Sequence, residues 1–127
     1  MTYCFVGERQ SPLAAARGWH WQDGRVCAGT LQRALLACGI EPSQQVWLNL
    51  WDTPGIGPCR EPPAVAVLVE RAAGRQIVAL GRLVHRELER ASVEHVTLTH
   101  PAARGAIRAT EVYQEHVRAV LAQAVAS

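Results

Sequence analysis

Lysine is absent from this sequence: all thirteen basic residues are arginine, and the formal net charge is only +2 at neutral pH. The arginine guanidinium binds phosphate through a bidentate fork, so contact with nucleic acid stays open. The small charge excess does not favour such contact by itself, and a GC-rich genome explains the arginine bias equally well. The sequence also lacks an apolar run long enough to cross a bilayer and a signal-peptide layout at its N-terminus. We therefore expect a cytoplasmic protein without a membrane partner.

Cysteines are few, and they are scattered. Cys4, Cys27, Cys38 and Cys59 contain no C-x-x-C pair, which argues against a zinc knuckle or an iron–sulfur cluster. Free buried thiols in a reducing compartment are the simpler interpretation. No group of His, Asp, Glu and Cys shows metal-ligand spacing, so we expect no metal and no cofactor. The first apolar segment is not followed by G-x-G-x-x-G, which disfavours a classical dinucleotide-binding fold.

The 127 residues have the composition of one globular domain, with 49% hydrophobic and 19% charged residues. Four short apolar segments are expected strands, at Tyr3–Val6, Val46–Leu50, Gln76–Leu80 and His95–Thr99. Helical patterns follow them, at Val26–Cys38, Glu61–Ala73, Gly81–Ala91 and Ala109–Ala124. The alternation predicts a single α/β domain over residues 1–127. Its expected architecture is a three-layer α/β/α sandwich with a central parallel four-stranded sheet.

Polar segments follow the expected strands. Gly7-Glu8-Arg9-Gln10-Ser11-Pro12 comes after the first strand, Asn49 lies near the end of the second, and His100-Pro101 follows the last. The connections 7–25 and 51–61 are long for so small a fold, and long connections in small domains are usually functional. The C-terminal ends of parallel strands share one sheet edge, where ligands bind. We therefore expect one site there, in which a carboxylate and an imidazole suffice for hydrolytic chemistry.

The order of these segments resembles the uracil-DNA glycosylase superfamily, most nearly its compact bacterial, archaeal and phage-like branch with a Gly-Glu first motif. A strand leads into Gly7-Glu8, a Gly-rich turn at residues 24–31 precedes a helix, a strand ends in Asn49, and a strand leads into His100-Pro101-Ala102. The resemblance spans residues 5–121. The first motif departs from the family, which usually continues with Pro-Gly where this chain has Arg9-Gln10-Ser11-Pro12.

The resemblance implies a role for each matching residue. Glu8 would orient water and favour the cationic sugar that forms when the base leaves, and His100 would donate a hydrogen bond to the O2 oxygen of the base. Asn49 would read the N3/O4 edge of uracil, because an amide presents a donor and an acceptor together. Trp19 or Trp21 would stack on the flipped base, and the loop length does not decide between them.

Further contacts are implied by the same resemblance. Gly7 would let the backbone approach the base closely. Arg104, Ile107 and Arg108 follow His100-Pro101, where the family inserts a wedge into the duplex and grips phosphate, so they are the expected DNA contacts. The implied function is a monofunctional DNA-repair glycosylase that removes uracil or a related modified pyrimidine by hydrolysing its N-glycosidic bond. The expected partner of this monomer is single- or double-stranded DNA, or a nucleotide.

Two other functions remain open. A catalytically silent relative would bind a nucleobase or nucleotide in the same pocket without cleaving it. The small charge excess, the short chain and the position of Arg9 beside Glu8 favour that reading. A nucleoside or nucleotide hydrolase that acts on free monomers is the third.

Structural roles also explain several of these residues. Glu8 could cap a helix N-terminus, and Asn49 could hydrogen-bond backbone at a strand end. His116 falls on the apolar stripe of the last helix, so we expect it to be half buried and structural. His85 and His95 belong to no motif.

Overall fold

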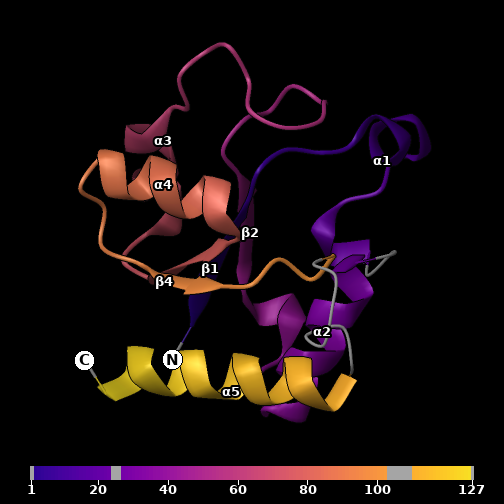
Figure 1. The fold of residues 1–127 in the computed structure, drawn as a ribbon, viewed down its shortest axis with the longest axis vertical. Helices are drawn as coiled ribbons and strands as arrows, with labels where there is room; N and C mark the ends of the chain where they lie inside the picture. Colours follow the sequence, from indigo (N-terminus) through magenta and orange to yellow (C-terminus); the bar gives the residue numbers. More distant parts are fainter. Residues whose placement is uncertain (1, 24–26, 103–109, 127) are drawn as a thin grey trace.

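The structure, a computed structural model, describes residues 2–23, 27–102 and 110–126 (Figure 1). The strands are β1 (Tyr3–Gly7), β2 (Val46–Asn49), β3 (Gln76–Leu80) and β4 (Val96–Leu98). The helices are α1 (Pro12–Arg17), α2 (Cys27–Ala37), α3 (Val65–Ala72), α4 (Arg82–Arg90) and α5 (Thr110–Ala126), with short 3-10 helices η1 (Trp21–Asp23) and η2 (Pro42–Gln44). Among these residues, no helix is both long enough and apolar enough to span a membrane.

The four strands form one parallel sheet in the order β2-β1-β3-β4. β1 and β3 are neighbours in the middle, and the chain leaves them in opposite directions, towards β2 and β4. Such a reversal leaves a crevice at the C-terminal ends of the two central strands. The register sets Gly7 beside Asn49 and Leu80 beside Leu98. The strand ends that carry the predicted site residues therefore lie along one edge of the sheet.

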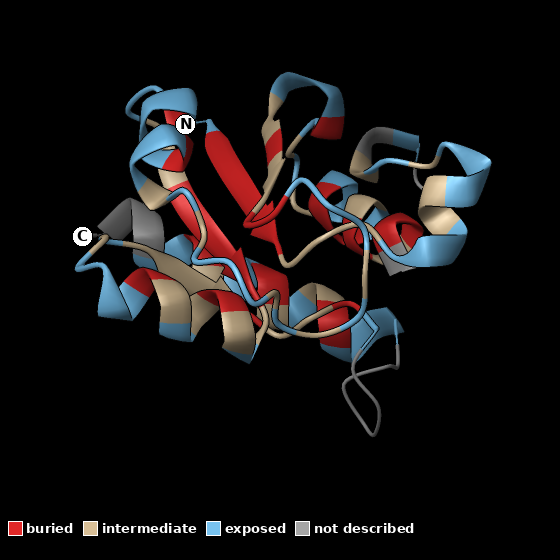
Figure 2. Cartoon of the chain, turned by 90° about the horizontal axis from the view of Figure 1, so that it is seen from above, coloured by how far each residue is buried: buried red, intermediate tan, exposed pale blue. Residues whose placement is uncertain are grey.

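Helices cover both faces of the sheet (Figure 1). Successive side chains of a strand point to opposite faces, so each strand can pack against helices on both sides. Phe5 and Val78 pack on one face with residues of α2 and α5. Val6 and Ile77 pack on the other face with residues of α3 and α4. Figure 2 shows the result: buried strands at the centre and exposed outer surfaces on the helices. The α/β fold with a parallel four-stranded sheet is as the sequence predicts, and the central strands β1 and β3 are buried on both faces.

Two helices differ from the sequence prediction. α1 lies within the long connection after β1, where no helix was expected. The Ser11 side chain caps it by accepting a hydrogen bond from the Ala14 N–H at 3.1 Å, and Gly18 ends it with a φ of 68°. α3 begins at Val65, later than the predicted start at Glu61, and Pro62-Pro63 disfavours helical backbone at residues 61 and 62.

Candidate functional site

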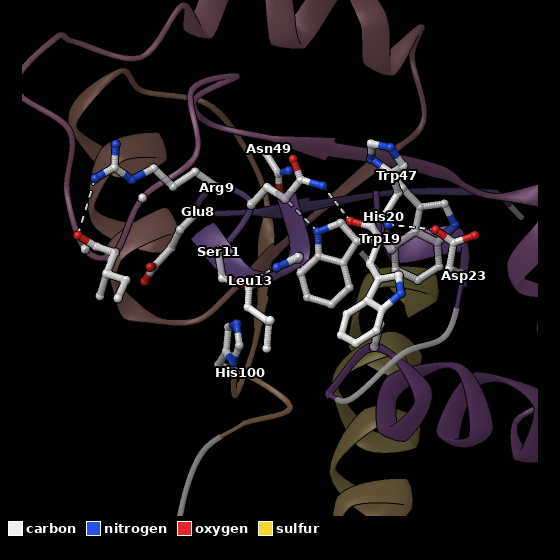
Figure 3. Close-up of a pocket in the computed structure, with 17 residues that line it drawn as sticks. Glu8, Arg9, Ser11, Leu13, Trp19, His20, Asp23, Trp47, Asn49 and His100 are labelled. Carbon is white, nitrogen blue, oxygen red and sulfur yellow. Dashed lines mark hydrogen bonds between the residues drawn. The ribbon is translucent and has the colours of Figure 1, made fainter. Parts of the chain in front are cut away.

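A cavity of about 630 Å³ lies at this edge of the sheet (Figure 3). Its wall comes from the connection after β1, the end of β2, the loop at residues 55–57 and the segment after β4. The lining includes Glu8, Trp19, Trp21, Asn49 and His100. Five residues predicted for one site, from segments far apart in the sequence, therefore share one cavity. Its volume lies within the range of about 300–1,000 Å³ that is typical of small-molecule sites.

The amide of Asn49 is held in one orientation beside Gly7. Its Oδ1 accepts a 3.0 Å hydrogen bond from Trp21 Nε1. An indole N–H can only donate, so this contact fixes which end of the amide is the oxygen. A Cβ on Gly7 would lie 2.8 Å from Asn49 Oδ1 and 2.8 Å from Trp21 Cζ2. Glycine is therefore required here by the close approach of two side chains.

Trp21 is a fixed wall of the cavity. Its ring stacks on Trp47, with centroids 6.0 Å apart and planes at 20°, and Trp47 stacks on Phe5 at 4.7 Å and 23°. The His100 ring meets Trp21 edge-on, with centroids 6.2 Å apart and planes at 62°. These contacts, together with the hydrogen bond to Asn49, hold the indole between the amide and the imidazole.

His100 is favoured as a neutral imidazole with one defined tautomer. Burial lowers its pKa, and the negative charge of Glu8 opposes this shift with a smaller effect. Nδ1 accepts a 3.1 Å hydrogen bond from the backbone N–H of Ala102. Nδ1 therefore carries no proton, and the neutral ring has its proton on Nε2. His100 can thus act as a hydrogen-bond donor through Nε2.

Helix α5 anchors the segment that carries His100. Nε2 of His116 accepts a 2.8 Å hydrogen bond from the Thr99 N–H, and the Tyr113 hydroxyl donates to the Thr99 carbonyl at 2.9 Å. Burial lowers the pKa of His116, which suits its role as an acceptor. His116 is half buried, as predicted, and its bond fixes the backbone immediately before His100.

Arg9 turns away from Glu8. Its guanidinium lies against Gly55, where a Cβ would overlap it, and Nη2 donates to the Ile56 carbonyl at 3.3 Å. In Figure 3 the Arg9 side chain reaches towards this loop while the Glu8 carboxylate points elsewhere. The Gly55 N–H also donates to the Gln10 carbonyl at 2.9 Å, which ties the two loops together. The neighbouring position of Arg9 in the sequence suggests that it neutralises Glu8. Among the described residues, however, Glu8 forms no ion pair, so Arg9 does not neutralise it.

Trp19 also lines the cavity, but its surroundings differ from those of Trp21. The Arg17 guanidinium lies over the Trp19 ring, 5.5 Å from its centroid. The Trp19 carbonyl accepts a 2.6 Å hydrogen bond from Gln10 Nε2. Trp21 contacts both Asn49 and His100, so its ring is the better placed of the two to meet a base held by those residues.

Not every predicted residue can be placed. Arg104, Ile107 and Arg108, the predicted DNA contacts, fall within residues 103–109 and lie outside the described residues. The cavity wall also contains side chains that the sequence did not single out, namely those of Gln10, Ser11, Leu13, Asp23 and Ile56. The length of the two connections predicted a functional role for these segments, but it could not select individual side chains.

The motif residues are the whole basis of the resemblance to uracil-DNA glycosylases. No protein-family model matches this chain, and no curated protein matches it.

Proposed function

We propose that this chain hydrolyses the N-glycosidic bond of uracil, or of a related modified pyrimidine, in DNA. One observation carries the proposal: Glu8, Asn49 and His100, from three different strand ends, line one cavity with two tryptophans. Base excision needs a carboxylate near the sugar, a donor for the departing base, an amide that reads the base edge and an aromatic wall. The cavity contains at least one candidate for each of these tasks.

Asn49 would recognise a carbonyl on the base edge. Trp21 Nε1 uses one lone pair of Oδ1, which leaves the two Nδ2 hydrogens and a second lone pair for a ligand. Uracil has a carbonyl oxygen at position 4, whereas cytosine has an amino group there. The fixed Nδ2 donor therefore favours uracil. Trp21 would stack on the base, a contact worth roughly 1–3 kcal/mol in nucleic-acid binders generally.

Glu8 and His100 would act on opposite ends of the breaking bond. The bond between N1 of the base and C1′ of the sugar breaks, and its electron pair leaves with the base. Glu8 stabilises the positive charge on the sugar and orients the water that adds to C1′. The Nε2–H of neutral His100 donates to O2, where negative charge develops. The proton lost by the water ends on the base, so the products are free uracil and a sugar with a hydroxyl at C1′.

Hydrolysis of a free nucleoside or nucleotide is the second candidate, and the size of the cavity favours it. A volume of about 630 Å³ suits a whole nucleoside as well as a single flipped base. Salt dependence separates the two candidates. DNA that is held through several phosphates binds much more weakly as salt rises, whereas a monomer responds little.

Release of uracil from single- and double-stranded oligonucleotides tests the proposal. The matched variants are Glu8→Gln, which keeps the size of the side chain and removes its charge, and His100→Ala. Glu70→Gln, an exposed carboxylate on α3, is the control. We expect both site variants to lose at least a hundredfold in rate, because removing one electrostatic or acid–base group commonly costs about 10²–10³. Glu70→Gln should keep the wild-type rate.

The remaining outcomes are equally decisive. Uracil-specific binding without turnover would replace the hydrolase with a silent base-binding relative. Release that both site variants leave unchanged would exclude this cavity as the active site. Release from deoxyuridine monophosphate but not from DNA would favour the monomer hydrolase.

A further inference from the structure

A second cluster of polar side chains lies outside the cavity, between α4 and the edge strand β4. His85 and Glu89 lie one helical turn apart on α4, and His95 directly precedes β4. One ligand-type atom from each of the three lies within 4.8 Å of the others. None of the three lines the cavity described above. Both histidines are half buried and Glu89 is exposed, so the cluster is reachable from solvent.

Hydrogen bonds orient the two imidazoles. Nδ1 of His95 lies 2.7 Å from the Val93 carbonyl oxygen, which can only accept, so Nδ1 carries the proton and Nε2 has the lone pair. This Nε2 faces His85 Nδ1 at 2.8 Å. If His85 Nδ1 also carried a lone pair, the two lone pairs would repel each other at this distance. Either a proton on His85 Nδ1 or a metal ion must therefore lie between the two nitrogens. The Thr97 hydroxyl also lies 3.1 Å from His85 Nδ1.

The bond from His95 to the backbone is the support that metal-binding histidines usually have. In protein metal sites, the ring nitrogen that is not bound to the metal almost always donates to a carbonyl, carboxylate or water. The bond to Val93 fixes both the tautomer and the direction of the His95 ring. It leaves Nε2 aimed at the space shared with His85 and Glu89.

We propose that His85, Glu89 and His95 bind one divalent transition-metal ion, for which Zn²⁺ is the best match. Two imidazole nitrogens and one carboxylate suit Zn²⁺, whereas Mg²⁺ and Ca²⁺ prefer sites made of oxygen ligands. Tetrahedral ligands at the usual zinc distances of about 2.0–2.1 Å are about 3.3 Å apart. The two facing nitrogens therefore need to separate by about 0.5 Å from their present 2.8 Å. Glu89 is exposed, so its carboxylate can turn in to complete the set.

A bound ion would join helix α4 to the edge strand β4. In the chain alone, the histidine pair and the Thr97 contact make that connection. His95 precedes β4 and His100 follows it, so the ion would stabilise the strand that leads to the cavity. Three protein ligands leave a fourth position for water. We assign the ion a structural role, because the cluster lies outside the cavity.

Calorimetric titration of the chelator-treated full chain with Zn²⁺ tests this proposal, and the visible spectrum of bound Co²⁺ gives a second readout. We expect one ion per chain, micromolar affinity or better, and a higher melting temperature. Glu89→Gln and His95→Ala should each weaken Zn²⁺ binding at least tenfold, since even removing a supporting partner of a metal ligand costs about 10–100-fold. Glu94→Gln removes the exposed carboxylate beside His95 in sequence and should bind as the wild type does.

Glu89 lies on an exposed helix surface, so Glu89→Gln keeps the test valid even if His95→Ala fails to fold. Cys4 and Cys38 are weak competitors, because burial raises the pKa of Cys4 to about 11 and raises the pKa of Cys38 as well. No stoichiometric binding of Zn²⁺ by the wild type would overturn the proposal. Equal affinity in the wild type and in Glu89→Gln would also overturn it, because Glu89 would then not be a ligand of the ion.

Discussion

Replacing Gly7 by alanine should disrupt the site through a single methyl group. The Cβ would lie 2.8 Å from Asn49 Oδ1, 2.8 Å from Trp21 Cζ2 and 2.9 Å from Trp21 Nε1. Real Cβ contacts are essentially never closer than 3.0 Å, so at least one of the two side chains must move. Neither moves freely, because Trp21 is stacked on Trp47 and hydrogen-bonded to Asn49.

The expected cost follows from these contacts. Overpacking a well-packed site typically costs about 1–3 kcal/mol. Losing the Trp21–Asn49 hydrogen bond accounts for about 0.5–1.5 kcal/mol within that range. We therefore expect Gly7→Ala to lower the free energy of unfolding by about 1–3 kcal/mol. In a domain of this size, each kcal/mol lowers the melting temperature by about 3–5 °C.

Urea denaturation followed by tryptophan fluorescence measures this cost, and a double-mutant cycle assigns it. In an Asn49→Ala background the nearest polar atom is gone, so Gly7→Ala should cost at least about 0.5 kcal/mol less there, within the range of coupling between contacting residues. Equal costs in both backgrounds, or wild-type stability of Gly7→Ala, would refute the close contact between Gly7, Asn49 and Trp21.

Three further predictions concern the pH dependence of stability, the positioning of His100 and the reactivity of the thiols. Because the folded pKa values of His100 and His116 are lowered, the unfolded chain binds more protons at acidic pH. The stability that these two neutral histidines contribute should be fully present above about pH 6.5 and fall as the pH drops below it, which urea denaturation between pH 5 and 8 can show. His100→Ala should flatten this pH dependence. An unchanged slope in that variant would contradict a lowered pKa of His100. His116→Ala should reduce uracil release without abolishing it, because it frees the Thr99 N–H next to His100; a rate equal to that of the wild type would exclude a positioning role. Iodoacetamide should modify half-buried Cys59 before fully buried Cys4, because burial raises the pKa of Cys4 to about 11. Peptide mass mapping of the native chain can check this order. Faster labelling of Cys4 would contradict its burial.

The fold was predictable because its signals are local. The apolar segments that form β1 and β3 are continuous, as expected of strands buried on both faces. A glycine also follows β3 and the ends of several helices. α1 was missed because its six residues lie inside a connection that looked long and irregular. Its Ser-Pro start and its Gly18 stop were nevertheless in the sequence.

The site was predictable in outline, because parallel topology brings strand ends together whatever their separation in sequence. Side-chain directions were not predictable. The sequence places Arg9 beside Glu8, but the loop at residues 55–57 draws the guanidinium away. The pairing of His85 with His95 depends on how α4 packs against β4, and the nine residues between them in sequence give no sign of it.

The proposed base-binding site is formed by the ends of β1, β2 and β4. Titration of the isotope-labelled Glu8→Gln variant with a uracil-containing oligonucleotide, followed by NMR, tests it most directly. We expect the NMR signals of the Asn49 side-chain amide, the Trp21 indole N–H and the His100 ring to shift together with one dissociation constant. An oligonucleotide with an abasic analogue at the same position should leave them in place. Absence of these shifts, or equal shifts with the abasic strand, would show that these residues do not form a base-binding site.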